Sequence, residues 1–254
     1  MHRSPRLSNL SQSRWTLAGL IQAVTWLSHL TLGGVDRILE RMKIRYRRGQ
    51  RHVHSPDLQY DVKMAVVAAV CVEVRAAPAR KVLLYQDELT YYRRPTVAQA
   101  YAPAGGPGLF AEQGHGSNSK RRVIGSLNLI TGQLFTWQRS HADVSTLIRY
   151  YRAVEAAYPE AETIFIAQDN WPVHFLPAVT GALEGTKIRL LRLPTYAPWT
   201  NPIEKVWRKL YQEVFHQHDF QDRWKDLQVT VEEWLQQWAN GSMELLRYVG
   251  LNPD

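Results

Sequence analysis

Three short apolar runs constrain this chain most, because each leads into an acidic residue. The first run ends in Gln86-Asp87-Glu88 and the second in Gln168-Asp169-Asn170. The third, Ile188–Leu193, enters a proline-rich loop and then an amphipathic helix that carries Glu204 in its first turn. Apolar runs of this length predict buried strands, and the functional residues of an open α/β sheet collect beyond the carboxyl ends of its strands. We therefore expect the three acids to meet at one edge of a sheet.

Such a cluster points to metal-dependent chemistry. Three carboxylates in a confined site raise one another's pKa, so a cation is needed to keep all three ionised. Oxygen donors without Cys or paired-His spacing favour Mg²⁺ or Mn²⁺. Two such ions activate a water or a 3′-hydroxyl and stabilise the leaving oxygen in phosphodiester displacement.

Each acid also has an ordinary structural interpretation. Asn201 fits the N-cap of the last helix, with Pro202 first and Glu204 third, so Glu204 could complete a capping box. It could equally pair with Arg208 one turn later. Asp87 and Asp169 could each form a strand-end Asx turn or a helix cap.

Glu88 is the rival of Asp87 in the first block. Strand alternation places Asp87 on the face of Leu83 and Tyr85, and it places Glu88 on the opposite face. Periodicity alone does not say which face is functional.

The positive charge of the chain is confined to its first fifth. Residues 1–54 hold ten of the 31 Lys and Arg residues and two of the 23 Asp and Glu residues. The remaining residues therefore hold 21 of each sign and carry no net charge. A basic module beside a neutral one indicates that the N-terminal part meets a polyanion, with nucleic acid as the default, although a solvated basic tail is the alternative.

The basic module is predicted to contain two short helices. Ser13 fits the cap of a helix over Trp15–Leu27, whose apolar face consists of Leu17, Leu20, Ile21, Val24 and Leu27. After a short break, a second helix turns Val35, Ile38, Leu39 and Met42 inward. This order is typical of a helix-turn-helix, in which the second helix enters the major groove. The segment Arg45–Arg51 is expected to form a basic wing, and the candidate DNA-binding residues are Arg37, Arg41, Lys43, Arg45, Arg47, Arg48 and Arg51.

The rest of the chain divides at Pro78. A long helix is expected from Ser55 to about Ala77, with one apolar side formed by Leu58, Val62, Ala65, Val66, Ala69 and Val70. We predict three segments: a helix-turn-helix DNA-binding domain over 1–54, a linker helix over 55–80, and an α/β catalytic domain with a C-terminal helix over 81–254.

Strands and helices alternate in the third segment. The segment rich in Gly, Ser and Asn, Ala104–Lys120, lacks the ending of a phosphate-binding P-loop, so a mobile loop is expected there. His216 and His218 are expected on the surface. Strands or hairpins are predicted over Thr90–Ala102 and over Arg122–Trp137 with Thr131-Gly132 as a turn, and helices over Asp143–Tyr158, from Pro172 toward Leu183, and over Arg223–Trp238.

Composition excludes several classes of protein. The single cysteine, Cys71, rules out a disulfide framework and a cysteine-rich zinc site. The longest apolar stretch, Met64–Val72, is too short to span a bilayer, and the N-terminus lacks the pattern of a secretory signal. We expect a cytoplasmic, nucleoid-associated protein with no membrane partner.

The acidic blocks resemble those of a known family. The blocks around Asp87 and Asp169, and the stretch from Leu193 to Trp207, are similar to the three acidic blocks of DDE transposases, in particular the insertion-sequence 630 branch of the mariner-like superfamily. The 34 residues between Asp169 and Glu204 match the spacing of that branch. Tyr92-Arg93-Arg94-Pro95 and the closing Leu246–Leu251 also resemble it.

The resemblance implies a fold, a site and a reaction. It implies an RNase H-like mixed sheet flanked by helices, in which Asp87, Asp169 and Glu204 hold two Mg²⁺ or Mn²⁺ ions. Asn170 and His174 match motif positions and are assigned supporting roles, although Asn170 could also cap the helix near Pro172. The expected reactions are cleavage at terminal inverted repeats and strand transfer into target DNA, with double-stranded DNA as partner and a homodimer on paired ends. Arg93 and Arg94 join the candidate DNA contacts.

One departure from the family concerns the N-terminus. Relatives carry two helix-turn-helix units, and this sequence begins at the second, so we expect the first unit to be lacking through a frameshift, a truncation or a misassigned start. A catalytically silent, truncated transposase that regulates by binding DNA is therefore the alternative function. A nuclease with an RNase H-like fold and no role in mobility is a third interpretation.

Overall fold

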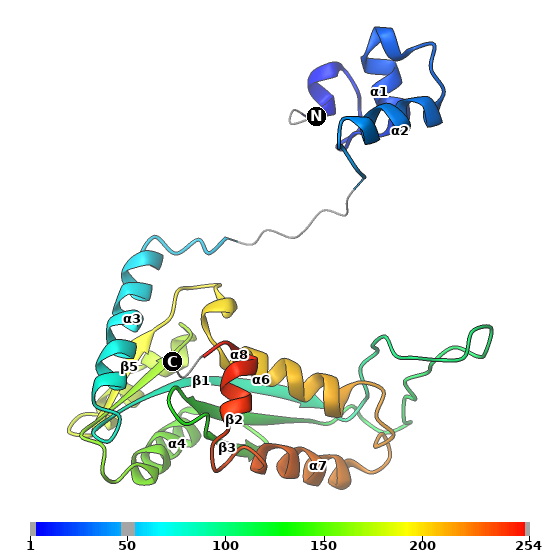
Figure 1. The fold of residues 1–254 in the computed structure, drawn as a ribbon. Coiled ribbons are helices and arrows are strands. Elements are labelled where there is room, and N and C mark those ends of the chain that lie inside the picture. Colours follow the sequence, from blue (N-terminus) through cyan, green and yellow to red (C-terminus); the bar gives the residue numbers. More distant parts are fainter. Residues whose placement is uncertain (1–3, 47–53, 252–254) are drawn as a thin grey trace. The chain divides into compact units, whose positions relative to one another are not determined.

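The chain folds as two compact units. The computed structural model describes residues 4–46 and 54–251, and the units are Met1–Val53 and His54–Asp254 (Figure 1). No helix within the described residues is long and apolar enough to cross a membrane.

The first unit is a small helical cluster. Its elements are η1 (Pro5–Ser8), α1 (Leu17–Ala23), η2 (Thr25–Leu27) and α2 (Leu32–Arg41). The predicted apolar face of the first helix is confirmed, because its residues pack around Leu20, Leu27 and Val35. Three details of the prediction are wrong. The helix predicted over Trp15–Leu27 ends at Ala23, and Thr25–Leu27 form the separate η2. Thr16 rather than Ser13 caps α1, and Met42 lies beyond the end of α2 with its side chain exposed. The predicted wing continues through Arg47, Arg48 and Arg51, which lie outside the described residues.

The second unit is built on one mixed sheet. Its strands are β1 (Lys81–Tyr92), β2 (Lys120–Asn128), β3 (Leu134–Arg139), β4 (Thr163–Gln168) and β5 (Ile188–Arg192), in the order β3-β2-β1-β4-β5. The first three form an antiparallel meander, whereas β4 and β5 run parallel to β1. The hairpin predicted around Thr131-Gly132 is confirmed. The helical elements are α3 (Tyr60–Ala76), α4 (Val144–Ala157), η3 (Pro172–Phe175), α5 (Pro177–Ala182), η4 (Pro198–Thr200), α6 (Ile203–Leu210), η5 (Tyr211–Phe215), α7 (Trp224–Gln236) and α8 (Met243–Val249).

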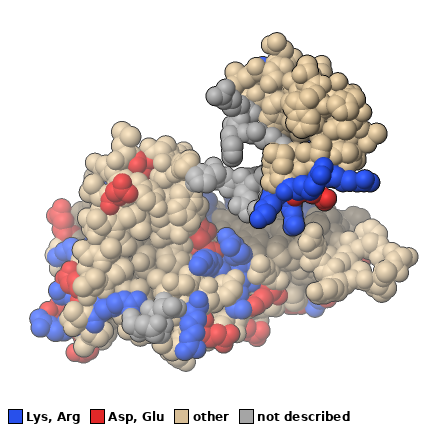
Figure 2. Space-filling view, turned by 45° about the horizontal axis from the view of Figure 1, so that its top comes forward, with Lys and Arg blue, Asp and Glu red and all other residues tan. Residues whose placement is uncertain are grey.

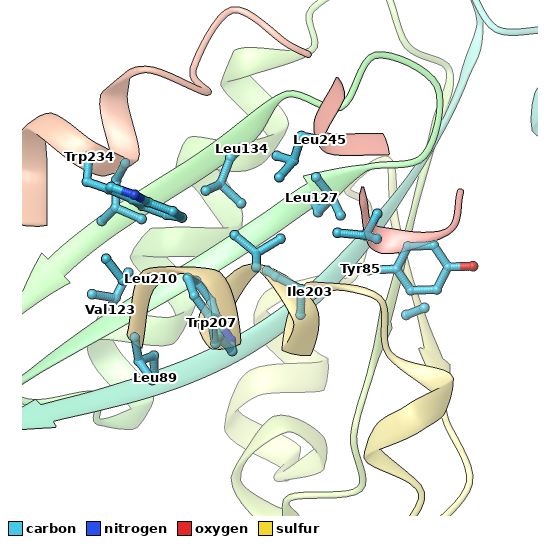
Figure 3. Packing of buried hydrophobic residues seen from close by; sticks show 14 of the residues in the cluster. Tyr85, Leu89, Val123, Leu127, Leu134, Ile203, Trp207, Leu210, Trp234 and Leu245 are labelled. Carbon is cyan, nitrogen blue, oxygen red and sulfur yellow. The ribbon is translucent and has the colours of Figure 1, made fainter. Parts of the chain in front are cut away.

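Helices cover both faces of the sheet. The larger core joins one face to α3, α6, α7 and α8 (Figure 3), and the smaller core joins the opposite face to α4 and α5. Alternation along β1 explains this division: Leu83, Tyr85 and Leu89 enter the larger core, while Val82 and Leu84 enter the smaller one.

The close packing of α6 on the sheet depends on Gly125 in β2. A Cβ atom at this position would lie 2.5 Å from the Trp207 ring and 3.3 Å from Ile203 Cδ1. Because the glycine leaves this space free, the first turn of α6 lies directly on β2 and β1.

Three further predictions differ from the structure. The strand that begins at Lys81 runs unbroken to Tyr92, and residues 93–102 form no strand beyond an isolated bridge at Thr96. The helix expected after Pro172 is interrupted at Leu176, which precedes a second proline. His218, expected on the surface, is buried, and its Nδ1 accepts a hydrogen bond from the Phe220 N–H.

The buried side of α3 also differs from the prediction. The helix buries Val67, Val70 and Val74, whereas the predicted stripe, apart from Val70, is exposed. Apolar residues of α3 occur on all sides of the helix, so their periodicity does not identify which side is buried. The division of the chain at residues 54 and 80 stays a prediction, although α3 packs against β1 of the second unit.

Candidate active site

Asp87 lies within a strand rather than after one. It pairs with Gly125 across β2, and β4 pairs with β1 only as far as Tyr85 and Ala167. The expectation that Asp87 follows a strand end is therefore wrong. Asp87 lies two residues past Tyr85, the last residue of β1 that pairs with β4.

Asp169 follows β4 directly, as predicted. Its Oδ1 accepts a 2.9 Å hydrogen bond from the Trp171 N–H, so the residue does form an Asx turn. The carboxylate is 58% exposed and remains open to solvent.

Glu204 belongs to the first turn of α6, but not through the predicted capping box. Pro202 is the N-cap residue, and no side chain in the described parts of the chain caps this helix. Asn201 instead ends the preceding η4, and its side-chain N–H donates 3.0 Å to the carbonyl oxygen of Gln86. This bond ties the start of α6 to β1 beside Asp87.

The three acids line one cavity of about 440 Å³ at this edge of the sheet. The remaining wall comes from Asn170–Pro172, Leu193–Pro198 and Asn201. Burial, and then the nearby carboxylates of Glu204 and Glu88, raise the pKa of Asp87 to about 8. Burial and Asp169 raise the pKa of Glu204, while Arg208 lowers it. The cavity thus disfavours the ionised forms of Asp87 and Glu204.

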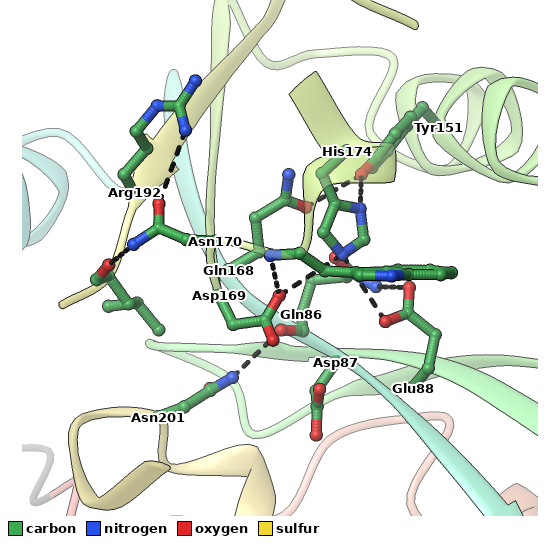
Figure 4. A network of polar contacts seen from close by, with 12 residues as sticks. Gln86, Asp87, Glu88, Tyr151, Gln168, Asp169, Asn170, His174, Arg192 and Asn201 are labelled. Atoms are coloured by element: carbon green, nitrogen blue, oxygen red, sulfur yellow. Dashed lines mark hydrogen bonds and ion pairs between the residues drawn. The ribbon is translucent and has the colours of Figure 1, made fainter. Parts of the chain in front are cut away.

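Glu88 points away from this cavity. It lies on the opposite face of β1, where its Oε1 accepts a 2.7 Å hydrogen bond from Gln86 Nε2 (Figure 4). Asp87 is the member of the pair that lines the cavity. The indole N–H of Trp207, a contact that the sequence did not indicate, donates 3.0 Å to Asp87 Oδ2.

The two supporting residues occupy different positions. Asn170 Nδ2 donates to the Leu193 carbonyl and to Thr195 Oγ1, at 2.7 and 3.0 Å, so it joins the exit of β4 to the cavity wall. It does not cap η3, whose N-cap is Trp171. His174 is fully buried on the other side of Asp169 and faces Glu88.

The segment that precedes α3 forms hydrogen bonds to the same cavity wall, and no sequence pattern predicts them. Asp57 Oδ2 accepts 2.8 Å from the Thr195 N–H, and Ser55 Oγ donates 2.6 Å to the Thr195 carbonyl. Lys63 pairs with Asp57 at 2.6 Å. The contact joins residues 138 apart in sequence.

The candidate DNA contacts are spread over both units. Arg37, Arg41, Lys43 and Arg45 are exposed, and Figure 2 shows Lys and Arg gathered on one flank of the first unit. Arg94 is exposed in the second unit, whereas the Arg93 guanidinium is engaged by the Gln221 carbonyl and by Asp222.

The donor groups in the cavity are not gathered around a single point. In residues 4–46 and 54–251, no three His, Cys, Asp or Glu side chains stand close enough together to hold a metal ion. The three cavity acids share an electrostatic environment without forming one coordination sphere.

The sheet and its acids define a class of protein, an RNase H-like domain with three carboxylates in one cavity. The chain belongs to the DDE superfamily endonucleases, whose family model matches residues 82–227. The chain is also 26% identical over 226 residues to the insertion element IS630 uncharacterized 39 kDa protein of Shigella sonnei. That match covers 87% of this chain, and the chain spans 64% of the length of the relative.

Solved structures support the fold. The Mos1 mariner paired end complex with Mn has a TM-score of 0.66 and 17% identity, and the match covers 99% of this chain and 76% of that one. The Mos1 transposase paired-end complex with left transposon end gives a TM-score of 0.64 at 16% identity, covering 100% and 76%. These likenesses confirm the predicted RNase H-like fold, and the family model confirms the predicted membership of the DDE superfamily. The assignment to the insertion-sequence 630 branch stays a prediction.

Proposed function

We propose that this chain is a DNA transposase that cleaves phosphodiester bonds at the ends of a mobile element and joins those ends to target DNA. The observation that carries this proposal is that Asp87, Asp169 and Glu204 line one open cavity. Membership of the DDE superfamily endonucleases supports it.

The proposed cofactor is a pair of Mg²⁺ or Mn²⁺ ions, which when bound activate a water or 3′-hydroxyl and stabilise the leaving oxygen. Asp87, Asp169 and Glu204 would hold them. Their oxygen donors fit a hard cation. Burial and then the neighbouring carboxylates raise the pKa of Asp87, and a bound divalent cation would offset both effects by favouring its ionised form. Trp207 would restrict the rotation of the Asp87 carboxylate, and Asn170 would fix the cavity wall opposite it.

The proposed partners are the terminal inverted repeats of the element and a target duplex. The exposed Arg37, Arg41, Lys43 and Arg45 of the first unit would contact phosphates, with Arg94 as a further contact on the second unit. Two copies of the chain would hold a pair of ends, and the first unit would serve as the DNA-binding domain.

A second candidate is a DNA-binding regulator without catalysis. The segregation of charge favours it, because the first 54 residues carry the whole net charge of +8. The acid-lined cavity favours the transposase, since binding alone does not require three acids in one site.

A nicking assay separates these functions. The wild-type chain and Asp169→Ala are incubated with Mg²⁺ or Mn²⁺ and a duplex that carries the element's flanking repeat, with the exposed Glu160→Ala as control. Cuts at the repeat boundary by the wild type and Glu160→Ala, lost in Asp169→Ala, support the transposase. Salt-sensitive binding without nicking supports the regulator. Cutting without preference for the repeat supports a nuclease unconnected to mobility.

A further inference from the structure

A buried polar network lies beneath Asp169, on the side of the sheet away from the cavity (Figure 4). Among its members are four polar side chains that are almost wholly withdrawn from solvent: Gln86, Glu88, Gln168 and His174. Burying polar groups costs free energy unless other groups satisfy them, so the network needs an explanation beyond packing.

His174 stands between two carboxylates. Its Nε2 lies 3.6 Å from Asp169 Oδ1 and 3.5 Å from Glu88 Oε2. This buried nitrogen has no hydrogen-bond partner among the described residues. Carboxylates are acceptors, so Nε2 can stabilise either one only as an N–H donor.

The ring of His174 has little freedom to turn. Its Nδ1 lies 3.1 Å from the Tyr151 hydroxyl, which donates 2.8 Å to Gln168 Oε1. The rings of Trp171 and Phe175 meet it nearly edge to face, with centroids 5.3 and 6.3 Å away. The direction of Nε2 is therefore fixed by three elements: α4, β4 and η3.

The side chain of Glu88 is also restrained by burial and by a hydrogen bond. Only 9% of its side chain is exposed, and Gln86 Nε2 donates to its Oε1. The Gln86 carbonyl in turn accepts from Asn201 at the start of α6. The Asp169 carboxylate, by contrast, is 58% exposed, and the hydrogen bond from the Trp171 N–H holds only its Oδ1.

We infer that Glu88 and His174 form a positioning pair, which orients the Asp169 carboxylate for a divalent cation. This inference rests on the proposed function. Glu88 fixes His174 from one side of Nε2, and His174 limits the rotation of Asp169 from the other side. The pair touches neither the cation nor the DNA, and outer partners of this kind typically change metal affinity or activity by about 10–100-fold.

The test measures Mn²⁺ binding to the full chain by electron paramagnetic resonance, without requiring turnover. Glu88→Gln keeps the shape of the side chain and an acceptor for Gln86. His174→Gln leaves every carboxylate in place, so weaker binding in this variant would not be an effect of lost negative charge. His218→Gln is the matched control, because His218 is also buried with an unpartnered Nε2 in the described chain. Asp169→Ala reports the metal site itself.

The inference predicts that Glu88→Gln and His174→Gln each raise the Kd for Mn²⁺ by about 10–100-fold, while His218→Gln binds as the wild type does. Cleavage should need correspondingly more Mn²⁺ and recover at saturating Mn²⁺. Thermal unfolding checks that each variant folds, and Glu88→Gln still decides the question if His174→Gln does not fold.

Two results would overturn the inference in different ways. If Asp169→Ala loses Mn²⁺ binding while folded Glu88→Gln binds within about twofold of the wild type, the positioning pair is wrong and the metal site stands. The same holds if only Glu88→Gln is weakened and folded His174→Gln is not. If Asp169→Ala binds Mn²⁺ like the wild type, the proposed metal site fails and the role of the pair fails with it.

Discussion

The indole N–H of Trp207 donates a 3.0 Å hydrogen bond to Asp87 Oδ2, so α6 directly holds the acid that β1 supplies. The helix that carries Glu204 thus also restrains the side chain of Asp87. The Trp207 ring approaches the sheet closely at Gly125, where a Cβ atom would lie 2.5 Å from it.

Replacing Trp207 by Phe should weaken catalysis more than folding. The aromatic ring remains in the core, but the Asp87 carboxylate loses its donor, so we expect cleavage to fall about tenfold at limiting Mg²⁺. Trp234→Phe is the matched control, because Trp234 donates 2.7 Å to Glu213 in the same core but outside the cavity. Equal losses in the two variants would show that the Trp207 bond has no special role.

Gly125→Ala should disturb both stability and activity. The added methyl group meets the Trp207 ring at 2.5 Å, so the ring or the whole of α6 must move. Overpacking of this kind costs about 1–3 kcal/mol, which urea unfolding would measure. Gly181→Ala in α5 is the control, since no atom lies within 4 Å of a Cβ there. A Gly125→Ala protein with unchanged stability and cleavage would contradict the packing argument.

Asp57→Asn should loosen the cavity wall. The Asp57 carboxylate accepts from the Thr195 N–H and from Lys63, and these bonds hold its pKa well below the usual range. We expect the Thr195 amide to exchange its hydrogen faster by on the order of tenfold, and cleavage to fall, because the wall leads into Glu204. Asp61→Asn, at an exposed position in the first turn of α3, should change neither. Unchanged protection of Thr195 would show that the contact is incidental.

The stability of the metal-free protein should depend on Asp87 and on pH. Folding raises the pKa of this carboxyl from 3.8 to about 8, chiefly through burial. The folded chain therefore binds the proton more tightly than the unfolded chain does, and stability is lost as the pH rises from about 4 toward 8. In EDTA, Asp87→Asn should have a higher Tm than the wild type at pH 8, with a smaller difference at pH 5. A difference that does not vary with pH would contradict this cause.

The sequence was sufficient to predict the acids, their order and the sheet that presents them. Asp169 follows the end of the apolar strand β4 directly, and Glu204 follows β5 after a proline-rich loop, features that the sequence pattern marks. The position of Asp87 was not predictable in this way, because β1 continues through it to Tyr92, and alternation does not mark where a parallel neighbour stops. The buried face of α3 was not predictable, because the helix carries apolar residues on all of its sides.

Contacts between residues far apart in the chain could not be predicted from the sequence either. The bond from the Thr195 N–H to Asp57 joins two connecting segments through the tertiary fold, and no local sequence pattern predicts that these residues meet. For Asn201 the local pattern was misleading. It predicted a helix cap, but the Asn201 side chain instead donates a hydrogen bond to the distant Gln86 carbonyl. The contact of His174 with Glu88 likewise follows from the sheet bringing β1 and the exit of β4 together.

The central claim is that three acids act as one site, and a comparison of neutral variants tests it most directly. Cleavage of the repeat duplex in Mg²⁺ would be measured for Asp87→Asn, Asp169→Asn and Glu204→Gln, with Glu160→Gln as control and DNA binding measured in parallel. We predict that each of the three variants loses at least about 10³-fold in cleavage while it still binds DNA, because every acid would hold a cation needed in the transition state. Full cleavage by any one of the three would remove that residue from the site and contradict the account.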